Sequence, residues 1–123
     1  MRSEHRYISL DETPIYYFKQ PSVGQKKAVL ILVHGMGEYG GRYAQVSDFL
    51  SEQGMAVYAP DLRGHGKSGG QRGFVNRFGD FHEDLGALHR LAESQNPGSP
   101  IFIFREILSP GKTGAHRNSS GMF

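Results

Sequence analysis

Cysteine is absent from this chain of 123 residues, which excludes disulfide bonds and thiol catalysis. A long apolar run is absent too, since none approaches the roughly 20 residues that a membrane-spanning helix needs. Residues 1–12 lack the apolar core of a secretory signal peptide. From these absences we expect a soluble protein of the cytoplasm with no transmembrane segment, for which any membrane contact would be peripheral.

An excess of charge is also missing from most of the chain. The net charge is +2, and acidic and basic side chains balance over residues 1–104. The surplus lies in residues 105–123, where Arg105, Lys112 and Arg117 are opposed only by Glu106. A nucleic-acid surface needs lysine and arginine clustered on the folded body. We therefore expect no nucleic-acid partner.

What the chain does have is an apolar run followed by a glycine-rich turn. Residues 28–43 read AVLILVHGMGEYGGRY, and the run over 28–33 is typical of a buried parallel strand. The glycines after it allow a sharp turn and leave backbone amides exposed at the carboxyl end of the strand. Ligands bind at that end of the strands in open α/β sheets. This turn is therefore the first candidate position for a site.

The pattern around this turn predicts an α/β fold that begins with a β-hairpin. Two β-rich segments flank the turn residues 11–14. Segments with helical spacing then alternate with short apolar runs, which favours a parallel sheet with right-handed crossover helices. Residues 61–78, rich in glycine and arginine, are expected to form a long surface loop. We expect strands over 5–10, 15–18, 28–33, 55–59 and 101–104, one helix over 41–53, and a second helix capped by Asp80 and Glu83, with an apolar stripe of Phe81, Leu85, Leu88 and Leu91.

After residue 104 the regular pattern stops. Residues 105–123 read REILSPGKTGAHRNSSGMF and show neither helical spacing nor alternation. We therefore divide the chain into residues 1–104 and a divergent tail, 105–123, which we expect to be disordered. A sheet of three parallel strands and a hairpin has edges that further elements normally cover. We expect an incomplete sheet whose exposed edges could self-associate.

One candidate site is a dinucleotide fingerprint. Residues 35–40, GMGEYG, match G-x-G-x-x-G after a strand, and Asp61 follows the next strand, where an acid would hold a ribose hydroxyl. Against this, Glu38 would place a carboxylate close to the phosphates, and a hairpin precedes the strand. A Rossmann-like dinucleotide-binding module that uses Gly35–Gly40 and Asp61 stays open as an alternative.

A second candidate is a serine motif. Residues 66–70, GKSGG, match G-x-S-x-G, but a nucleophile elbow needs a buried strand directly before it and a helix directly after it. Ser68 follows loop-like residues, so we interpret it as part of a glycine-rich loop. The six histidines lack the spacing of metal ligands, and His82 and His89 are expected to face solvent. No metal and no cofactor are predicted.

A third candidate is an oxyanion turn at residues 34–37. A backbone amide presented after a central strand can stabilise the negative oxygen of a tetrahedral intermediate, by about 3 kcal/mol per donor. The N–H of Met36 is the natural donor in this turn. From the spacing alone, this role and a purely structural turn are equally supported.

Taken together, HGMGEYGGRY, VYAPDLRGHGKS and DFHEDL resemble the α/β-hydrolase fold. More narrowly, they resemble its monoacylglycerol lipase and lysophospholipase-like branch, which is grouped with the serine aminopeptidases. The resemblance covers residues 7–104 and implies an acyl-ester or lipid substrate, no cofactor, an oxyanion amide at Met36, and a pairing of Glu38 with Arg42. It implies a role in shaping the loops beside the site for His34, Gly35, Gly37, Glu38, Arg42, Asp61, Arg63, Gly64, His65, Gly66 and Ser68.

The resemblance ends where the nucleophile should stand. After the strand 101–104 a family member should read G-H-S-x-G-G, whereas this chain reads REILSP. Ser109 is in the wrong register, and Pro110 lacks the amide that should follow the nucleophile. The acid and histidine of a triad would come later in such a chain. We therefore expect a truncated or frameshifted N-terminal part of a serine hydrolase, with no catalytic residue and no activity, or else a non-catalytic interaction remnant.

Overall fold

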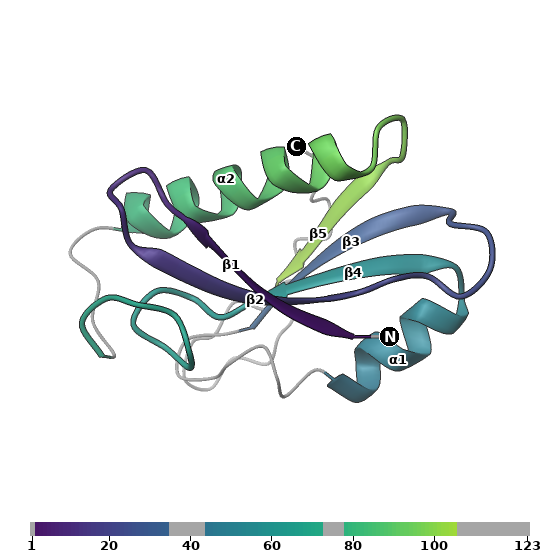
Figure 1. The fold of residues 1–123 in the computed structure, drawn as a ribbon, viewed down its shortest axis with the longest axis horizontal. Coiled ribbons are helices and arrows are strands. Elements are labelled where there is room, and N and C mark those ends of the chain that lie inside the picture. Colours follow the sequence, from purple (N-terminus) through teal and green to yellow (C-terminus); the bar gives the residue numbers. More distant parts are fainter. Residues whose placement is uncertain (1, 35–43, 73–77, 106–123) are drawn as a thin grey trace.

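The computed structural model describes residues 2–34, 44–72 and 78–105. Over these ranges the chain forms one five-stranded sheet with a helix on each of its faces (Figure 1). The elements are β1 (Ser3–Ile8), β2 (Pro14–Gln20), β3 (Ala28–Val33), α1 (Ala44–Glu52), β4 (Met55–Pro60), α2 (Phe78–Gln95) and β5 (Ile101–Arg105).

The strands lie in the order β1-β2-β4-β3-β5. The hairpin strands β1 and β2 pair antiparallel, and β2 also pairs antiparallel with β4. The central strand β3 pairs parallel with both β4 and β5. The predicted fold, a hairpin followed by parallel strands with crossover helices, is therefore confirmed.

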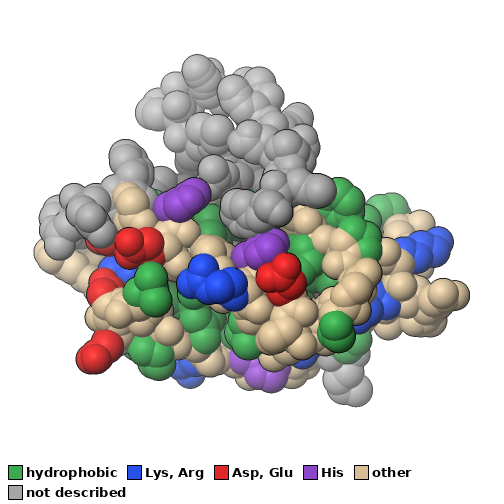
Figure 2. Space-filling model, turned by 90° about the horizontal axis from the view of Figure 1, so that it is seen from above, with side chains coloured by type: hydrophobic (Ala, Val, Ile, Leu, Met, Phe, Trp, Pro, Cys, Tyr) green, Lys and Arg blue, Asp and Glu red, His purple; other side chains and the backbone are tan. Residues whose placement is uncertain are grey.

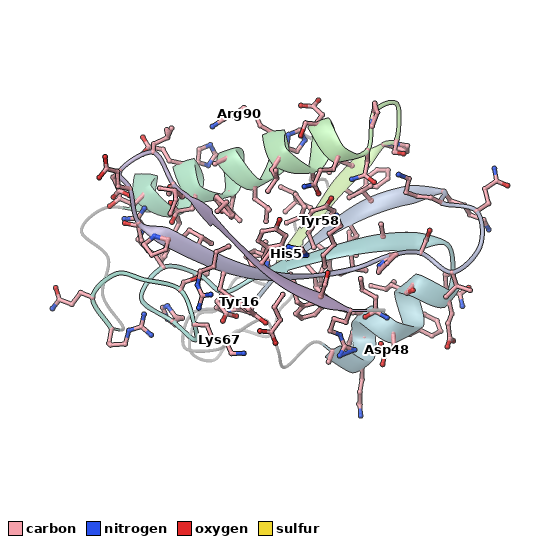
Figure 3. All side chains as sticks on the ribbon, viewed as in Figure 1. His5, Tyr16, Asp48, Tyr58, Lys67 and Arg90 are labelled. Carbon is pink, nitrogen blue, oxygen red and sulfur yellow. The ribbon has the colours of Figure 1, made fainter. Side chains whose placement is uncertain are left out.

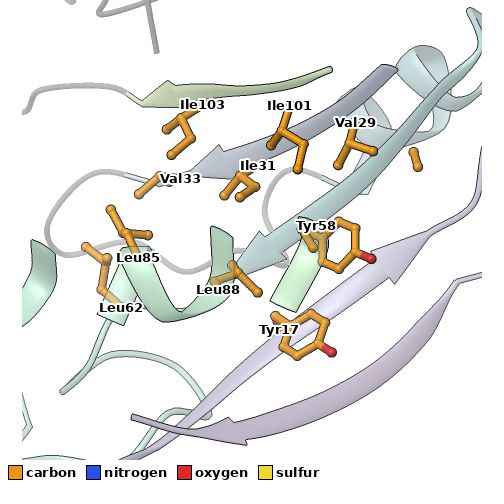
Figure 4. Packing of buried hydrophobic residues seen from close by; sticks show 12 residues of the cluster. Tyr17, Val29, Ile31, Val33, Tyr58, Leu62, Leu85, Leu88, Ile101 and Ile103 are labelled. Carbon is orange, nitrogen blue, oxygen red and sulfur yellow. The ribbon is translucent and has the colours of Figure 1, made fainter. Parts of the chain in front are cut away.

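The larger core lies between the sheet and α2. Val29, Ile31 and Val33 alternate along β3 and join Leu85 and Leu88 of α2 in one buried cluster (Figure 4). Leu32, which points the other way, joins a smaller cluster against α1. This period-two alternation within an all-apolar strand is what a parallel strand covered on both faces requires.

Helix α2 confirms its predicted apolar stripe and corrects its predicted start. Leu85 and Leu88 are buried, and Phe81 and Leu91 pack against the same cluster. The helix begins at Phe78, so Asp80 lies in its first turn and the predicted capping box of Asp80 with Glu83 is wrong. A carboxylate there still interacts favourably with the helix macrodipole. Phe78 therefore belongs to α2 and not to the preceding loop.

The segment after β4 is not the surface loop that its composition predicts. Asp61, Arg63 and Ser68 are all buried, with 2%, 8% and 3% of their surface exposed. Buried polar groups are stable only when they are hydrogen-bonded or paired. Their partners fix this segment against the hairpin and α2.

The two edges of the described sheet differ in chemistry. Glu4, His5 and Arg6 of β1 are exposed, and the charges of Glu4 and Arg6 discourage pairing with another chain. On β5, Phe102 and Phe104 are 38% and 39% exposed. Among the described helices, none combines the length and apolarity needed to cross a membrane.

Candidate functional site

The candidate site lies at the carboxyl ends of β3 and β4. His34 directly follows β3, and the segment 61–70, here called the β4 loop, directly follows β4. Because β3 and β4 are parallel neighbours, these two ends meet at the same edge of the sheet. Open α/β sheets bind ligands outside this edge.

His34 is held by the β4 loop. Its side chain is buried, with 1% exposed, and its Nε2 accepts the backbone N–H of Leu62 at 2.8 Å. The ring of His65 lies 5.8 Å from the His34 ring, centroid to centroid. His34, which precedes the glycine-rich residues of the predicted turn, is therefore fixed to the end of the neighbouring strand.

The β4 loop is closed by its own polar residues. The Asp61 carboxylate accepts the backbone N–H of Lys67 at 2.8 Å. Ser68 Oγ donates to the Asp61 carbonyl at 2.5 Å and accepts the backbone N–H of Tyr16 at 2.9 Å. Gly64 and Gly66 have φ of 78° and 51°, in the left-handed region that favours glycine. The serine therefore ties the loop to the hairpin, and its oxygen is occupied.

Arg63 fastens the β4 loop to α2 and to the hairpin turn. Its guanidinium donates to Asp84 through Nε (2.8 Å) and Nη2 (2.7 Å), and to Asp11 through Nη1 (2.7 Å) and Nη2 (3.1 Å). The side chains of Arg63 and Asp84 are 9% and 4% exposed, whereas that of Asp11 is 50% exposed. A third carboxylate, of Asp80, lies 4.0 Å away. We call Arg63 with Asp84 and Asp11 the arginine clamp.

The electrostatics of the clamp follow from these contacts. Hydrogen bonds from Arg63, and then from Thr13, hold the pKa of Asp11 well below its usual range. Hydrogen bonds to Asp84 and Asp11 raise the pKa of the Arg63 guanidinium further, so it stays charged. Ser9 Oγ donates to the Asp84 carboxylate, and the Tyr7 hydroxyl donates to the Asp84 carbonyl at 2.6 Å. Strand β1, the hairpin turn and α2 thus meet at one buried ion pair.

An open depression of about 370 Å³ lies beside the β4 loop. Lys67 lines this depression, and its Nζ lies 4.9 Å from the centroid of the Tyr16 ring (Figure 3). The same Nζ is 3.4 Å from Oε1 of Glu4. Seen from above, the molecule shows side chains of both charge signs interspersed among apolar ones (Figure 2). The lining of the depression is Arg2, Glu4, Tyr16, Phe18, Ala44, Asp61, Gly66 and Lys67.

Seven predicted site residues fall within the described ranges, and the structure brings them together. They are His34, Asp61, Arg63, Gly64, His65, Gly66 and Ser68. The predicted oxyanion donor Met36 lies outside the described residues, as do Gly35, Gly37, Glu38, Gly40, Arg42 and Ser109. Sequence reasoning missed Asp84 and Asp11, the partners of Arg63. Asp84 could have been found, because its spacing to Phe81 and Leu88 puts a carboxylate on the apolar face of α2.

The histidines and acids of the described residues form no group of three that could hold a metal ion. His82 is exposed as predicted, whereas His89 is half-buried. Asp61, the acid of the dinucleotide alternative, has its carboxylate engaged by the Lys67 amide inside the β4 loop. The antiparallel hairpin joined to β4 also separates this sheet from a doubly wound dinucleotide fold.

The sheet order, the crossover helices and the β4 loop define an α/β hydrolase. The family model described as "Serine aminopeptidase, S33" matches residues 24–106, and the chain belongs to this family. It is 33% identical over 110 residues to a monoacylglycerol lipase of Mycolicibacterium smegmatis, a match that covers 89% of this chain and 39% of that protein. It is 35% identical over 80 residues to the Homo sapiens monoglyceride lipase, which covers 65% of this chain and 26% of that protein.

Solved structures share the fold. A monoglyceride lipase of Saccharomyces cerevisiae superposes with a TM-score of 0.71 at 24% identity, over 86% of this chain and 35% of that chain. A carboxyl esterase of Bacillus coagulans superposes with a TM-score of 0.73 at 23% identity, over 83% of this chain and 35% of that chain. The chain thus spans less than half the length of these relatives.

Proposed function

We propose that this chain is the amino-terminal part of a serine hydrolase that cleaves the carboxylic ester of a monoacylglycerol or a lysophospholipid. The observation that carries the proposal is the closure of the β4 loop on His34 at the carboxyl end of β3. Relatives that this chain resembles at 33% and 35% identity are called monoacylglycerol and monoglyceride lipases, which supports the substrate class.

The residues of this chain would support acyl transfer without reacting themselves. The Met36 amide would donate to the oxyanion of the tetrahedral intermediate, and Glu38 with Arg42 would fix the turn that carries it. His34 and the β4 loop would hold the start of that turn. Serine, histidine and aspartate of a triad, which form and hydrolyse the acyl-enzyme, would lie in a longer chain.

We further propose that these 123 residues do not hydrolyse esters. Strand β5 ends at Arg105, and residues 105–110 read REILSP where the sequence of the nucleophile elbow is expected in this family. Without the serine, histidine and aspartate of a triad no acyl-enzyme can form, so we expect no measurable turnover. On this proposal the chain consists of a hydrolase part, 1–104, and a divergent tail, 105–123.

The test begins with the nucleotide sequence from the codon for Ile101 to several hundred bases beyond Ser109. We expect a shifted reading frame that encodes G-x-S-x-G and later aspartate and histidine motifs. The restored chain should hydrolyse a monoacylglycerol, and its nucleophile Ser→Ala variant should not. The unrepaired chain, assayed alongside, should match buffer. A frame without these motifs, or ester hydrolysis by the unrepaired chain, would contradict the proposal.

Association between copies through β5 is a second candidate role. The exposed Phe102 and Phe104 lie on an edge strand that has no charged residue before its last one, Arg105. The opposite edge, β1, is lined by Glu4, His5 and Arg6. Edge strands without charges are the ones that pair with other chains.

A further inference from the structure

The hydrogen bond between Leu62 and His34 defines the protonation of a buried imidazole. A backbone N–H can only donate, so the ring nitrogen that it reaches must accept. That nitrogen is His34 Nε2, 2.8 Å from the Leu62 nitrogen. A neutral imidazole has one protonated nitrogen, so the proton of His34 is on Nδ1.

The Leu62 amide is itself fixed from both sides. On one side, Asp61 receives the Lys67 amide on its carboxylate and the Ser68 hydroxyl on its carbonyl. On the other side, Arg63 is held by four hydrogen bonds, two to Asp84 and two to Asp11. The Leu62 N–H, which selects the His34 tautomer, therefore belongs to the residue directly before Arg63 of the arginine clamp.

His65 is the titratable neighbour of His34 on the β4 loop. Its Nδ1 lies 3.0 Å from the Arg63 carbonyl, which can only accept, so Nδ1 of His65 also carries a proton. The two rings lie 5.8 Å apart and are tilted by 56°. Both imidazoles are thus oriented by backbone groups of residues 62 and 63.

We propose that Arg63 is a positioning residue that, through the Leu62 amide, locks His34 into its Nδ1–H tautomer and so fixes the carboxyl end of β3. This inference deepens the proposed function, because His34 opens the turn that would carry the oxyanion donor. Because Arg63 also donates to Asp11, the hairpin turn contributes to holding His34, although β4 separates the hairpin from β3 in the sheet.

The test is nuclear magnetic resonance of the ¹⁵N-labelled 123-residue chain at neutral pH. Long-range ¹H–¹⁵N spectra report which nitrogen of each imidazole is protonated, and a His34→Asn variant assigns the His34 signals by their loss. We expect a single Nδ1–H tautomer for His34 and a Leu62 amide protected from hydrogen exchange. In Arg63→Gln we expect mixed His34 tautomers and Leu62 exchange about tenfold faster or more.

Two further variants complete the design. Arg90→Gln makes the same chemical change at an exposed position of α2 and should leave both signals unchanged. Asp11→Asn removes the half-exposed carboxylate and keeps the Asp84 pair, so it should fold and move both signals in the same direction by a smaller amount. This variant decides the outcome if Arg63→Gln does not fold.

The proposal is overturned by an Nε2–H or charged His34 in the unmodified chain. It is also overturned if Arg63→Gln or, failing that, Asp11→Asn lowers stability yet leaves the His34 tautomer and Leu62 exchange unmoved, which would make the clamp merely structural. Neither measurement involves turnover. Failure here would therefore leave the proposed hydrolase function standing, and failure of the restored chain to cleave esters would leave the tautomer result standing.

Discussion

Arg63 and Asp84 meet side by side in the interior, guanidinium Nε to Oδ2 at 2.8 Å and Nη2 to Oδ1 at 2.7 Å. One residue comes from the β4 loop and the other from the buried face of α2. A bidentate pair of this kind is among the stronger charge-assisted contacts in proteins. It joins the candidate site to the main core.

Replacing Asp84 should destabilise the fold strongly. Asp84→Asn leaves the buried Arg63 guanidinium with the half-exposed Asp11 carboxylate and the more distant one of Asp80. Breaking a buried pair in this way costs about 3 kcal/mol or more. Urea unfolding gives the free energy. Asp48→Asn removes the partner of Arg2 in an exposed pair and should barely move the midpoint. Equal losses in the two variants would contradict the importance of burial.

The stability of the chain should fall in acid, partly through Asp11. The pKa of Asp11 is held below its ordinary value by Arg63 and Thr13, so the folded state binds its proton less readily than the unfolded state. The stabilisation is present above the ordinary carboxyl pKa of about 4 and is lost as the pH falls below it. Asp11→Asn should flatten urea midpoints measured between pH 7 and 3. Glu12→Gln, in the same turn, should keep the slope of the unmodified chain.

Stability should also fall in alkali, because a raised pKa makes stability decrease with rising pH, whereas the lowered pKa of Asp11 makes it decrease with falling pH. Burial, and then the charge of Asp84, raises the pKa of Tyr7 far above its ordinary value. The folded state holds this proton more tightly, so its contribution is present below a pH of about 10 and is lost as the pH rises further. Thermal unfolding of Tyr7→Phe should show a shallower alkaline decline. An unchanged decline would mean that other groups, such as the buried Tyr58, dominate.

Removing the Ser68 hydroxyl should lower the stability of the fold, because this serine has a structural role. Ser68→Ala leaves the Tyr16 amide and the Asp61 carbonyl without their buried partner, which costs about 1–3 kcal/mol. Ser94→Ala, at an exposed position of α2, removes one hydroxyl bond to the Leu91 carbonyl and should cost far less. Urea unfolding measures both. An undiminished stability of Ser68→Ala would contradict the role assigned to this hydroxyl.

Association through β5 should depend on its exposed phenylalanines. In sedimentation, the average mass should rise with concentration, and Phe104→Lys should suppress the rise by placing a charge on the edge. Leu10→Lys changes an exposed apolar residue at the hairpin turn and should leave it unaltered. A chain that stays monomeric at all concentrations, or a rise that both variants suppress equally, would contradict β5 as the interface.

Local patterns predicted the elements well. The apolar run 28–33 coincides with β3, and Gly54, with φ of 94°, follows α1 as a helix-ending glycine should. The start of α2 was missed because an aspartate followed by a glutamate three residues later fits both a helix cap and the first turn of a helix. The sequence pattern does not distinguish these two positions, and in the structure the helix begins at Phe78. The burial of the β4 loop was missed for a different reason. Its polar residues look solvated until their partners, Asp84 and Tyr16, are brought in from distant segments.

The hydrogen bonds of Tyr7 and Ser9 to Asp84 join residues 77 and 75 positions apart. Contacts of such long sequence separation form late and slow the folding of a domain. At a ribosomal rate of about 5–20 residues per second, the hairpin would wait roughly 4–15 s for its partner residue to be synthesised. Strand β1, which is synthesised first, is thus among the last elements to form its contacts with α2. For those seconds Tyr7 and Tyr17, which the hairpin contributes to the main core, would lack their cover from α2.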